Sequence, residues 1–236
     1  MKTAEKLYEG KAKIVYATED PNSVLQYFKD DATAFNAQKK GSIKGKGEVN
    51  AEISAALFQL LEEVGVPTHF LSLEGPRELL TRKLEIFLIE VTVRNRVAGG
   101  MAKAFDIPEG TVLQTPVLEW HYKSDACGDP LMNDDHIQAM KLATPEEVEE
   151  VKRLTWIVNK TLIEFFAAAG LELVDYKLEF GKDKSGKIYL GDEISPDTCR
   201  LWDMKTGEKL DKDRFRRDLG KVEEAYQEVL KRVRER

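Results

Sequence analysis

The segment from residue 173 to residue 203 constrains the fold more than any other, because its apolar and polar residues alternate. Between Val174 and Phe180 every second residue is apolar, which is the pattern of a β-strand with one buried face. A turn-rich linker, Gly181–Lys187, and a second strand-like run, Ile188–Ile194, follow. The pattern therefore predicts a β-hairpin, and the segment also carries seven acidic residues.

The polar face of this hairpin predicts a cation site. If Gly181 pairs with Ile188, Lys177 lies opposite Asp192, and Glu179 is diagonal to Asp192. The two acidic Cα atoms are then about 7–8 Å apart, so both carboxylates reach one cation. Mg²⁺ takes oxygen ligands, usually one or two carboxylates with phosphates and water. From the residues alone, a solvated face with a Lys–Asp pair is an equal alternative.

The composition is that of a globular protein and argues against several classes of function. The chain has 236 residues, 42% of them hydrophobic, which suffices for one large domain or two lobes. Its net charge of −6 argues against general binding of nucleic acid or membrane surfaces. Two distant cysteines and three scattered histidines predict neither a disulfide framework nor a zinc site. Without an apolar leader or spanning segment, a cytoplasmic location is expected.

The predicted elements indicate an α+β fold with a β-rich N-terminal lobe, residues 1–85, and a larger mixed lobe, residues 86–236, with a cleft between them. Strands are expected within residues 6–17, 24–29, 68–72, 79–84 and 87–94. In the N-terminal lobe, Asn50 is expected to cap a helix that Gly65 ends. Residues 38–47 are expected to form a solvated basic loop.

The C-terminal lobe is expected to contain three helices and the acidic hairpin. A short helix is predicted at residues 101–105, and residues 107–135 have no regular pattern. Thr144 to Glu147 form a capping box with proline at the first helical position, so a helix is expected to run from there to residue 169. The last helix is predicted over residues 213–234.

Three further segments are candidate sites, each with a plainer alternative. Gly10 to Lys13 form a tight turn with two lysines that suits a polyphosphate, although an ordinary charged hairpin is favoured from the residues alone. Residues 90–100 place Arg94 and Arg96 before a glycine turn at the start of a helix, which would suit an anion-binding site. An ordinary salt-bridged surface strand is an equal alternative. The loop of residues 195–200 carries an acid and an arginine beside the proposed cation site. Its Cys199 lacks a nearby histidine, so a nucleophilic role is disfavoured.

These motifs resemble one family. LVDYKLEFG followed by GDEISPDTCRLWD resembles the signature of the SAICAR synthetases, the phosphoribosylaminoimidazole-succinocarboxamide synthases of purine biosynthesis. EGKAK, VRNRVAGG and DKDRFR match the same family in the same order, and the resemblance covers essentially the whole chain. It implies a ligase reaction in which ATP, L-aspartate and the carboxylated ribotide CAIR give SAICAR, ADP and phosphate. It also implies an ATP-grasp or kinase-like two-lobed fold and a homodimer.

The resemblance assigns the ATP and metal site. The segment Lys11-Ala12-Lys13 would bind ATP, with its two lysines on the phosphates. Arg82 and Leu84 lie where the family's inter-lobe segment contacts adenine. Glu179 and Asp192 would hold Mg²⁺.

The resemblance also assigns the ribotide site. Arg94, Lys177 and Asp197 would line the phosphoryl-transfer site, and Gly100 and Arg200 would contact CAIR beside them. Many relatives have serine where Gly100 stands, so backbone N–H groups would replace its hydroxyl. They also differ at residues 88–90, where proline-valine-glutamate is common, and near Asn36, where an aspartate is common.

Two other functions remain open from the residues. A small-molecule kinase would share the ATP lobe, but it would need no aspartate and would release a phosphorylated product. A non-catalytic nucleotide-binding module would bind ATP without aspartate-dependent release of ADP.

Overall fold

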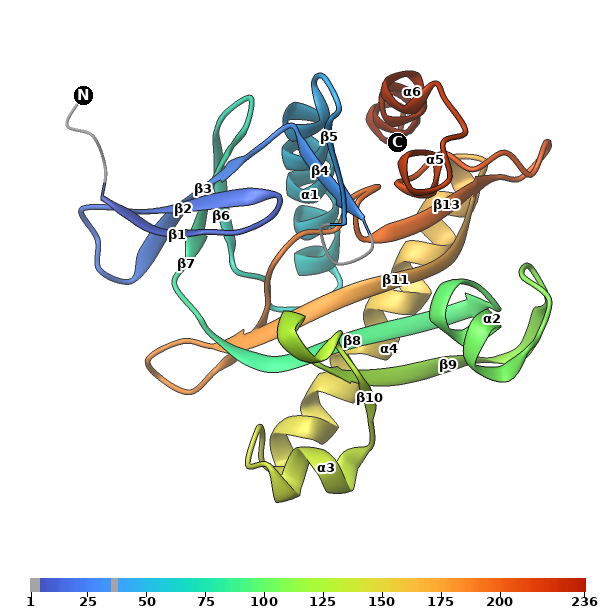
Figure 1. Ribbon diagram of the computed structural model, residues 1–236. Coiled ribbons are helices and arrows are strands. Elements are labelled where there is room, and N and C mark those ends of the chain that lie inside the picture. The colour runs from blue at the N-terminus through green and yellow to red at the C-terminus, as the bar shows by residue number, and fades with distance from the viewer. Residues whose placement is uncertain (1–4, 35–37) are drawn as a thin grey trace.

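The first of two main sheets is antiparallel and contains the N-terminal strands. The computed structural model describes residues 5–34 and 38–236 (Figure 1). The strand order in this sheet is β1 (Lys6–Glu9), β2 (Lys13–Ala17), β3 (Ser23–Phe28), β7 (Glu78–Arg82) and β6 (Phe70–Gly75). Helix α1 (Lys46–Glu63) packs against β3, β6 and β7, and buries Ile53, Leu57 and Leu61.

The second sheet runs through the centre of the molecule and carries most of the predicted site residues. Its strand order is β10 (Leu131–Met132), β9 (Val112–Tyr122), β8 (Glu85–Arg96), β11 (Leu171–Lys182) and β12 (Ile188–Leu190). The sixth strand, β13 (Cys199–Asp203), pairs with β11 beyond the end of β12. Every pair is antiparallel, so β11 is a central strand with β8 along its length on one side.

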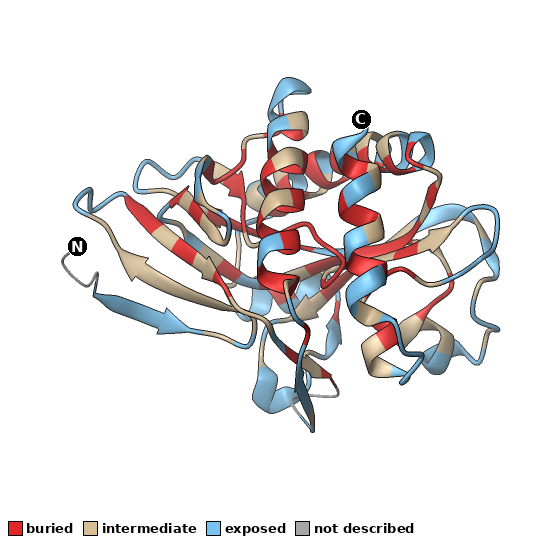
Figure 2. Ribbon diagram, turned by 90° about the horizontal axis from the view of Figure 1, so that it is seen from above, coloured by how far each residue is buried: buried red, intermediate tan, exposed pale blue. Residues whose placement is uncertain are grey.

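Helices cover these sheets and enclose one apolar core. Helix α4 (Pro145–Ala168) packs against β11, and α6 (Val222–Arg234) packs against α1 (Figure 1). Buried residues gather on the inner faces of these helices and along the strands beneath them (Figure 2). The shorter elements are the hairpin β4 (Asp31–Ala34) and β5 (Lys39–Ser42), helices α2 (Gly99–Phe105), α3 (Asp134–Ala139) and α5 (Asp213–Arg216), and a 3₁₀ turn, Asp125–Cys127. No helix among the described residues is long and apolar enough to cross a membrane.

The α+β class is confirmed, and so is the capping box of α4. The Thr144 hydroxyl accepts the Glu147 N–H at 3.3 Å, and the Glu147 carboxylate accepts the Thr144 N–H at 2.8 Å. The chain leaves the first sheet at Arg82 and enters the second at Glu85, next to the predicted lobe boundary at residue 85. The division into two lobes stays a prediction.

The predicted start of the first helix was wrong. Helix α1 begins at Lys46, and Asn50 is buried within it. The reason is a distant cap: the Asp30 carboxylate accepts the Gly47 N–H at 2.9 Å and the Gly45 N–H at 3.3 Å. Because this acceptor precedes the helix by more than a dozen residues, the local sequence does not reveal it.

Two other predictions were also wrong. Residues 107–135 were expected to be irregular, but β9 is an eleven-residue strand, and Pro116 sits where its pairing with β8 shifts register. The last helix was expected over residues 213–234, but it is divided into α5 and α6. Asp218, Gly220 and Lys221 between them have φ angles of 54°, 70° and 48°, which no right-handed helix contains.

Candidate active site

The acidic hairpin pairs one residue out of the predicted register. Lys182, not Gly181, lies opposite Ile188, so the prediction that Lys177 faces Asp192 was wrong. The second strand was expected to reach Ile194, but β12 ends at Leu190. The chain then turns, and Asp192 takes a left-handed φ of 58°.

This turn nevertheless brings the two predicted metal ligands together. The Gly191 N–H donates to the Glu179 carbonyl at 2.8 Å, which holds the start of the turn against β11. Burial raises the pKa of Glu179, and the nearby charge of Asp192 raises it further. Two carboxylates that repel each other in this way would be stabilised by a bound cation.

Lysines from separate elements contact the two carboxylates. Lys13 of β2 contacts Asp192, and its Nζ lies 3.2 Å from Glu193. Burial would lower the pKa of Lys13, but Asp192 and Glu193 outweigh burial and raise it. Lys123, just after β9, contacts Glu179. The site therefore alternates positive and negative groups.

The carboxylate pair fits Mg²⁺ that arrives with phosphates. The described residues contain no group of three or more His, Cys, Asp or Glu side chains placed to hold a metal. Mg²⁺ needs no such cage, since it commonly uses one or two carboxylates, substrate phosphates and water. Glu179 and Asp192 would supply those carboxylates, and both side chains are partly exposed, at 14% and 27%.

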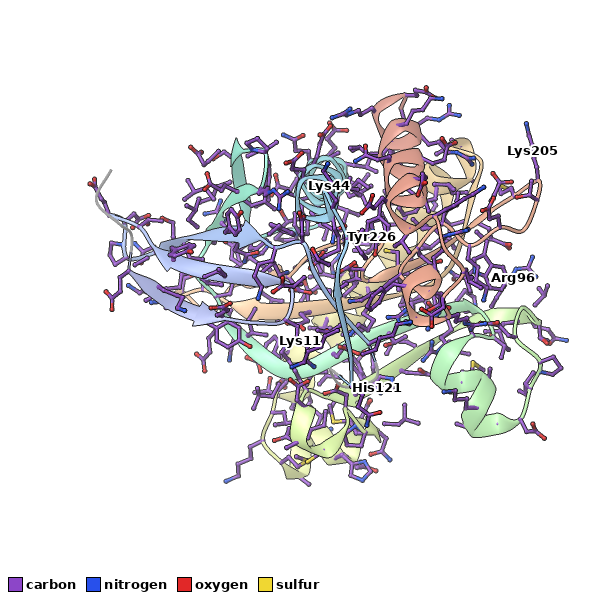
Figure 3. The ribbon with its side chains drawn as sticks, turned by 45° about the horizontal axis from the view of Figure 1, so that its top comes forward. Lys11, Lys44, Arg96, His121, Lys205 and Tyr226 are labelled. Atoms are coloured by element: carbon purple, nitrogen blue, oxygen red, sulfur yellow. The ribbon has the colours of Figure 1, made fainter. Side chains whose placement is uncertain are left out.

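The other predicted ATP residues lie around this group. Lys11 lies at the tip of the β1–β2 hairpin (Figure 3). It forms an ion pair with Asp125 at 2.5 Å. The Ala12 carbonyl accepts the Lys29 N–H at 2.8 Å. Leu84 lies beside the Gly191 turn, because a Cβ on that glycine would be 3.5 Å from its side chain. The Arg82 guanidinium instead lies over the Tyr189 ring, 5.3 Å from its centre.

A cavity of about 220 Å³ opens along the same face of β11. Five residues predicted for the ribotide site line it: Arg94, Gly100, Lys177, Asp197 and Arg200. A larger cavity of about 550 Å³ lies between the starts of β8 and α4, but no predicted site residue lines it. The smaller cavity is therefore the candidate active site.

Alternating charges on neighbouring strands fix two arginines in this cavity. Asp175 of β11 lies in register with Arg94 of β8 on one side and Arg200 of β13 on the other. Its carboxylate accepts hydrogen bonds from both guanidiniums, at 2.6 Å and 2.8 Å. Arg94 also binds Glu119 at 2.9 Å, and Arg200 binds Asp213 at 3.0 Å. Both planar groups are thus held in one orientation before any ligand binds.

The glycine pair at the start of α2 allows the chain to approach these arginines. A Cβ on Gly99, whose φ is 54°, would lie 2.8 Å from the Arg200 guanidinium. A Cβ on Gly100 would lie 3.6 Å from the Arg94 guanidinium, so the serine that the resemblance leads us to expect here would have room. Asn36, the other predicted departure, lies outside the described residues.

Lys177 stands between the cavity and the carboxylate pair. Its Nζ lies 2.5 Å from Glu90 of β8. Burial would lower the pKa of Lys177, but Glu90 outweighs it, with smaller contributions from Glu179 and Asp192. Lys177 is therefore a cation that acts on both parts of the site.

Asp197 is the centre of a buried network that the sequence did not reveal. Its carboxylate accepts hydrogen bonds from Lys46 at 3.0 Å and from the Tyr226 hydroxyl at 2.6 Å, and Lys212 lies at 3.4 Å. Burial would raise the pKa of Asp197, but these three groups hold it well below its usual range. Lys46 was expected in a solvated loop, but its side chain is 1% exposed.

Sequence reasoning missed several other residues near these groups. For Cys199, by contrast, the structure agrees with the expectation. Burial raises the pKa of its thiol, which makes it a poor nucleophile. Asp175 follows the period-two pattern of Lys177 and Glu179, and that pattern was a usable signal. No sequence signal pointed to the site residues on β9 and the turn after it, because this segment was expected to be irregular. These residues are Glu119, His121, Lys123 and Asp129.

Known proteins resemble the whole chain. The family model for SAICAR synthetase matches residues 6–233. A phosphoribosylaminoimidazole-succinocarboxamide synthase of Magnetococcus marinus is 55% identical over 235 residues, covering 99% of this chain and 97% of the relative. The crystal structure of this synthase from Ehrlichia chaffeensis superposes with a TM-score of 0.96, at 47% identity and 98% coverage of both chains.

A second solved structure shows a nucleotide bound to a similar protein. It is a SAICAR synthetase in complex with ADP, with a TM-score of 0.93, 46% identity and 96% coverage of both chains. The matched range, residues 6–233, includes both sheets and the candidate site. This chain therefore belongs to the SAICAR synthetase family, the ATP-dependent ligases of purine biosynthesis that are named phosphoribosylaminoimidazole-succinocarboxamide synthases.

Proposed function

We propose that this chain joins L-aspartate to the carboxylate of CAIR, and that the reaction passes through an acyl phosphate. The supporting observation is the spacing along β11, where Asp175, Lys177 and Glu179 lie on one face and their charges alternate in sign. Residues four apart on a strand are separated by about 13 Å, comparable with the length of a ribotide. A ribotide whose phosphate lies at Arg94 and Arg200 then places its carboxylate near Lys177 and Glu179.

The chemistry follows from the poor reactivity of a carboxylate toward an amine. An oxygen of the CAIR carboxylate attacks the γ-phosphorus of ATP, the bond to the bridging oxygen breaks, and ADP leaves. The amine of L-aspartate attacks the resulting acyl phosphate, a proton leaves the nitrogen, and phosphate is expelled. Oxygen from the CAIR carboxylate therefore ends in the released phosphate.

The residues of the site stabilise charge and position the reactants. Lys13 and Lys11 neutralise the ATP phosphates, and Lys177 orients the reacting carboxylate. Arg94 and Arg200 bind the ribotide, and Asp197 anchors the loop that precedes Arg200. Glu179 and Asp192 would hold Mg²⁺, which when bound neutralises phosphate oxygens.

The decisive experiment measures ADP release with CAIR present, with and without L-aspartate. We expect ADP release that depends on both substrates and matches SAICAR formation one to one. Release of ADP with CAIR alone and accumulation of a stable phosphorylated product would instead identify a small-molecule kinase. With ¹⁸O in the CAIR carboxylate, the label should appear in phosphate, and its absence would exclude the acyl phosphate.

The remaining predictions from the resemblance concern the whole molecule. We propose a kinase-like arrangement in which residues 1–85 bind the nucleotide and residues 86–236 bind the metal and substrates. The homodimer and the cytoplasmic location stay predictions. Sedimentation of the purified chain tests the first, and subcellular fractionation tests the second.

A further inference from the structure

His121 lines the candidate active-site cavity and has no role in the reaction described above. It projects from β9 (Figure 3), and 18% of its side chain is exposed. Its Nδ1 lies 3.1 Å from the Asp129 carbonyl oxygen, and its Nε2 lies 3.3 Å from a Glu119 carboxylate oxygen. Both ring nitrogens thus face oxygens that accept hydrogen bonds, an arrangement that only the protonated ring satisfies with two N–H donors.

The same Glu119 oxygen also binds Arg94. Oε2 of Glu119 accepts the Arg94 Nε–H at 2.9 Å and faces His121 Nε2 at 3.3 Å. Burial would raise the pKa of Glu119, but His121 and Arg94 outweigh it, so this carboxylate stays ionised. The single negative charge of Glu119 is therefore shared between two cations. Loss of the His121 proton would lower the net charge of the cavity by one.

The groups around His121 favour its charged form. Burial would lower its pKa, but Glu119, the Asp129 carbonyl and Glu90 together raise it above the ordinary value. Glu90 of β8 lies directly opposite His121 in the ladder, and Leu131 of β10 lies opposite on the other side without a charge. Arg94 on β8 binds Glu119, and Lys177 on β11 binds Glu90. Lys123 after β9 also interacts with Glu90 by charge, and the Asp129 carboxylate accepts the Ser124 N–H at 2.9 Å.

We propose that His121 is a positioning residue that, as an imidazolium, holds Glu119 and through it Arg94, so that the protonated enzyme binds the anionic ribotide more tightly. This role rests on the proposed function, since it takes CAIR as the anion in the cavity. Binding and protonation are linked reciprocally, so CAIR must raise the pKa of His121 by as much as protonation strengthens CAIR binding. A rise of one pKa unit corresponds to about a tenfold difference in affinity.

The chain contains only three histidines, so NMR of ¹³C-labelled histidine can follow each ring separately. The signal of His121 is the one absent from His121→Gln. In the free enzyme its pKa should lie above the ordinary value, and Glu119→Gln should lower it. Saturating CAIR should raise it by about one unit. An unshifted pKa in the free enzyme, or no change in Glu119→Gln, would overturn the role of Glu119, whatever the enzyme binds.

Kinetics distinguish positioning from a general loss of structure. At about pH 6, where the wild-type ring is charged, His121→Gln should raise the KM for CAIR about tenfold and change kcat much less. As the pH rises above the pKa of the ring in the CAIR complex, the two enzymes should converge, because the wild-type ring is then neutral. Titration of the ribotide phosphate affects the wild type and His121→Gln equally, so its effect cancels in the ratio of their KM values. A ratio of KM values that does not depend on pH would refute the proposal.

Two controls keep the result interpretable. His136→Gln changes a histidine on α3 that does not line the cavity, and its KM should follow the wild-type pH dependence. His121→Asn replaces His121→Gln if the latter fails to fold. Absence of CAIR- and aspartate-dependent ADP release in the wild type would refute the proposed function instead, and the NMR comparison of wild type with Glu119→Gln would still test the His121–Glu119 pair.

Discussion

Removal of one hydroxyl from the Asp197 network should destabilise the protein measurably. In Tyr226→Phe, the buried Asp197 carboxylate loses a donor at 2.6 Å and keeps Lys46 and Lys212. A hydrogen bond to a charged group contributes about 1.5–3 kcal/mol. For a chain of this length each kcal/mol shifts the Tm by about 2–4 °C, so the Tm should fall by about 3–12 °C.

The chain offers a matched control in Tyr176. Both tyrosines are buried, at 0% and 1% exposure, but the Tyr176 hydroxyl has no hydrogen-bond partner among the described residues. Removing an unsatisfied hydroxyl is close to neutral or stabilising. Tyr176→Phe should therefore keep or raise the Tm in the same thermal unfolding assay. Equal losses in the two variants would refute the reasoning, because the effect would then come from packing and not from Asp197.

The pH dependence of this difference has a definite sign. The pKa of Asp197 is lowered in the folded protein, so the stabilisation by its partners is fully present above the ordinary carboxyl range. It is lost only as the pH falls through the lowered value. The difference in Tm between wild type and Tyr226→Phe should therefore be the same at about pH 8 and about pH 6.

Four further substitutions test the site. Asp192→Asn removes the charge but keeps a residue type that tolerates the left-handed φ of 58°. Turnover with Mg²⁺-ATP should therefore be abolished, while the Tm should change little. Glu179→Gln should have the same effects. Near-normal rates at saturating Mg²⁺-ATP would contradict the metal assignment. Arg94→Lys should raise the KM for CAIR, because a lysine cannot bind Glu119 and Asp175 with one planar group; an unchanged KM would count against it. Gly99→Ala should raise the same KM, since its Cβ would lie 2.8 Å from the Arg200 guanidinium, and calorimetric titration with CAIR would measure the loss.

Local patterns in the sequence predicted those parts of the fold that depend on neighbouring residues. The Thr144 capping box, the period-two face of β11 and the end of α1 near Gly65 all follow from contacts within a few positions. The errors arose where a distant group decides the structure. Asp30, which lies between β3 and β4, caps α1 from a distant part of the chain. Strand β9 forms although Pro116 interrupts its pattern, because β8 supplies a partner on one side.

The site shows why two carboxylates predicted from a wrong register still lie close together. A slip of one residue normally moves every side chain of a strand to the other face. Here the strand stops at Leu190, and the left-handed backbone at Asp192 changes the direction of the chain before the slip reaches the carboxylate. Lys13 from the first sheet then holds Asp192 near Glu179, so the pair depends on a turn and a lysine and not on the ladder. Lengthening β12 by substitutions that remove the turn should therefore separate the two carboxylates, although every residue of the motif would remain.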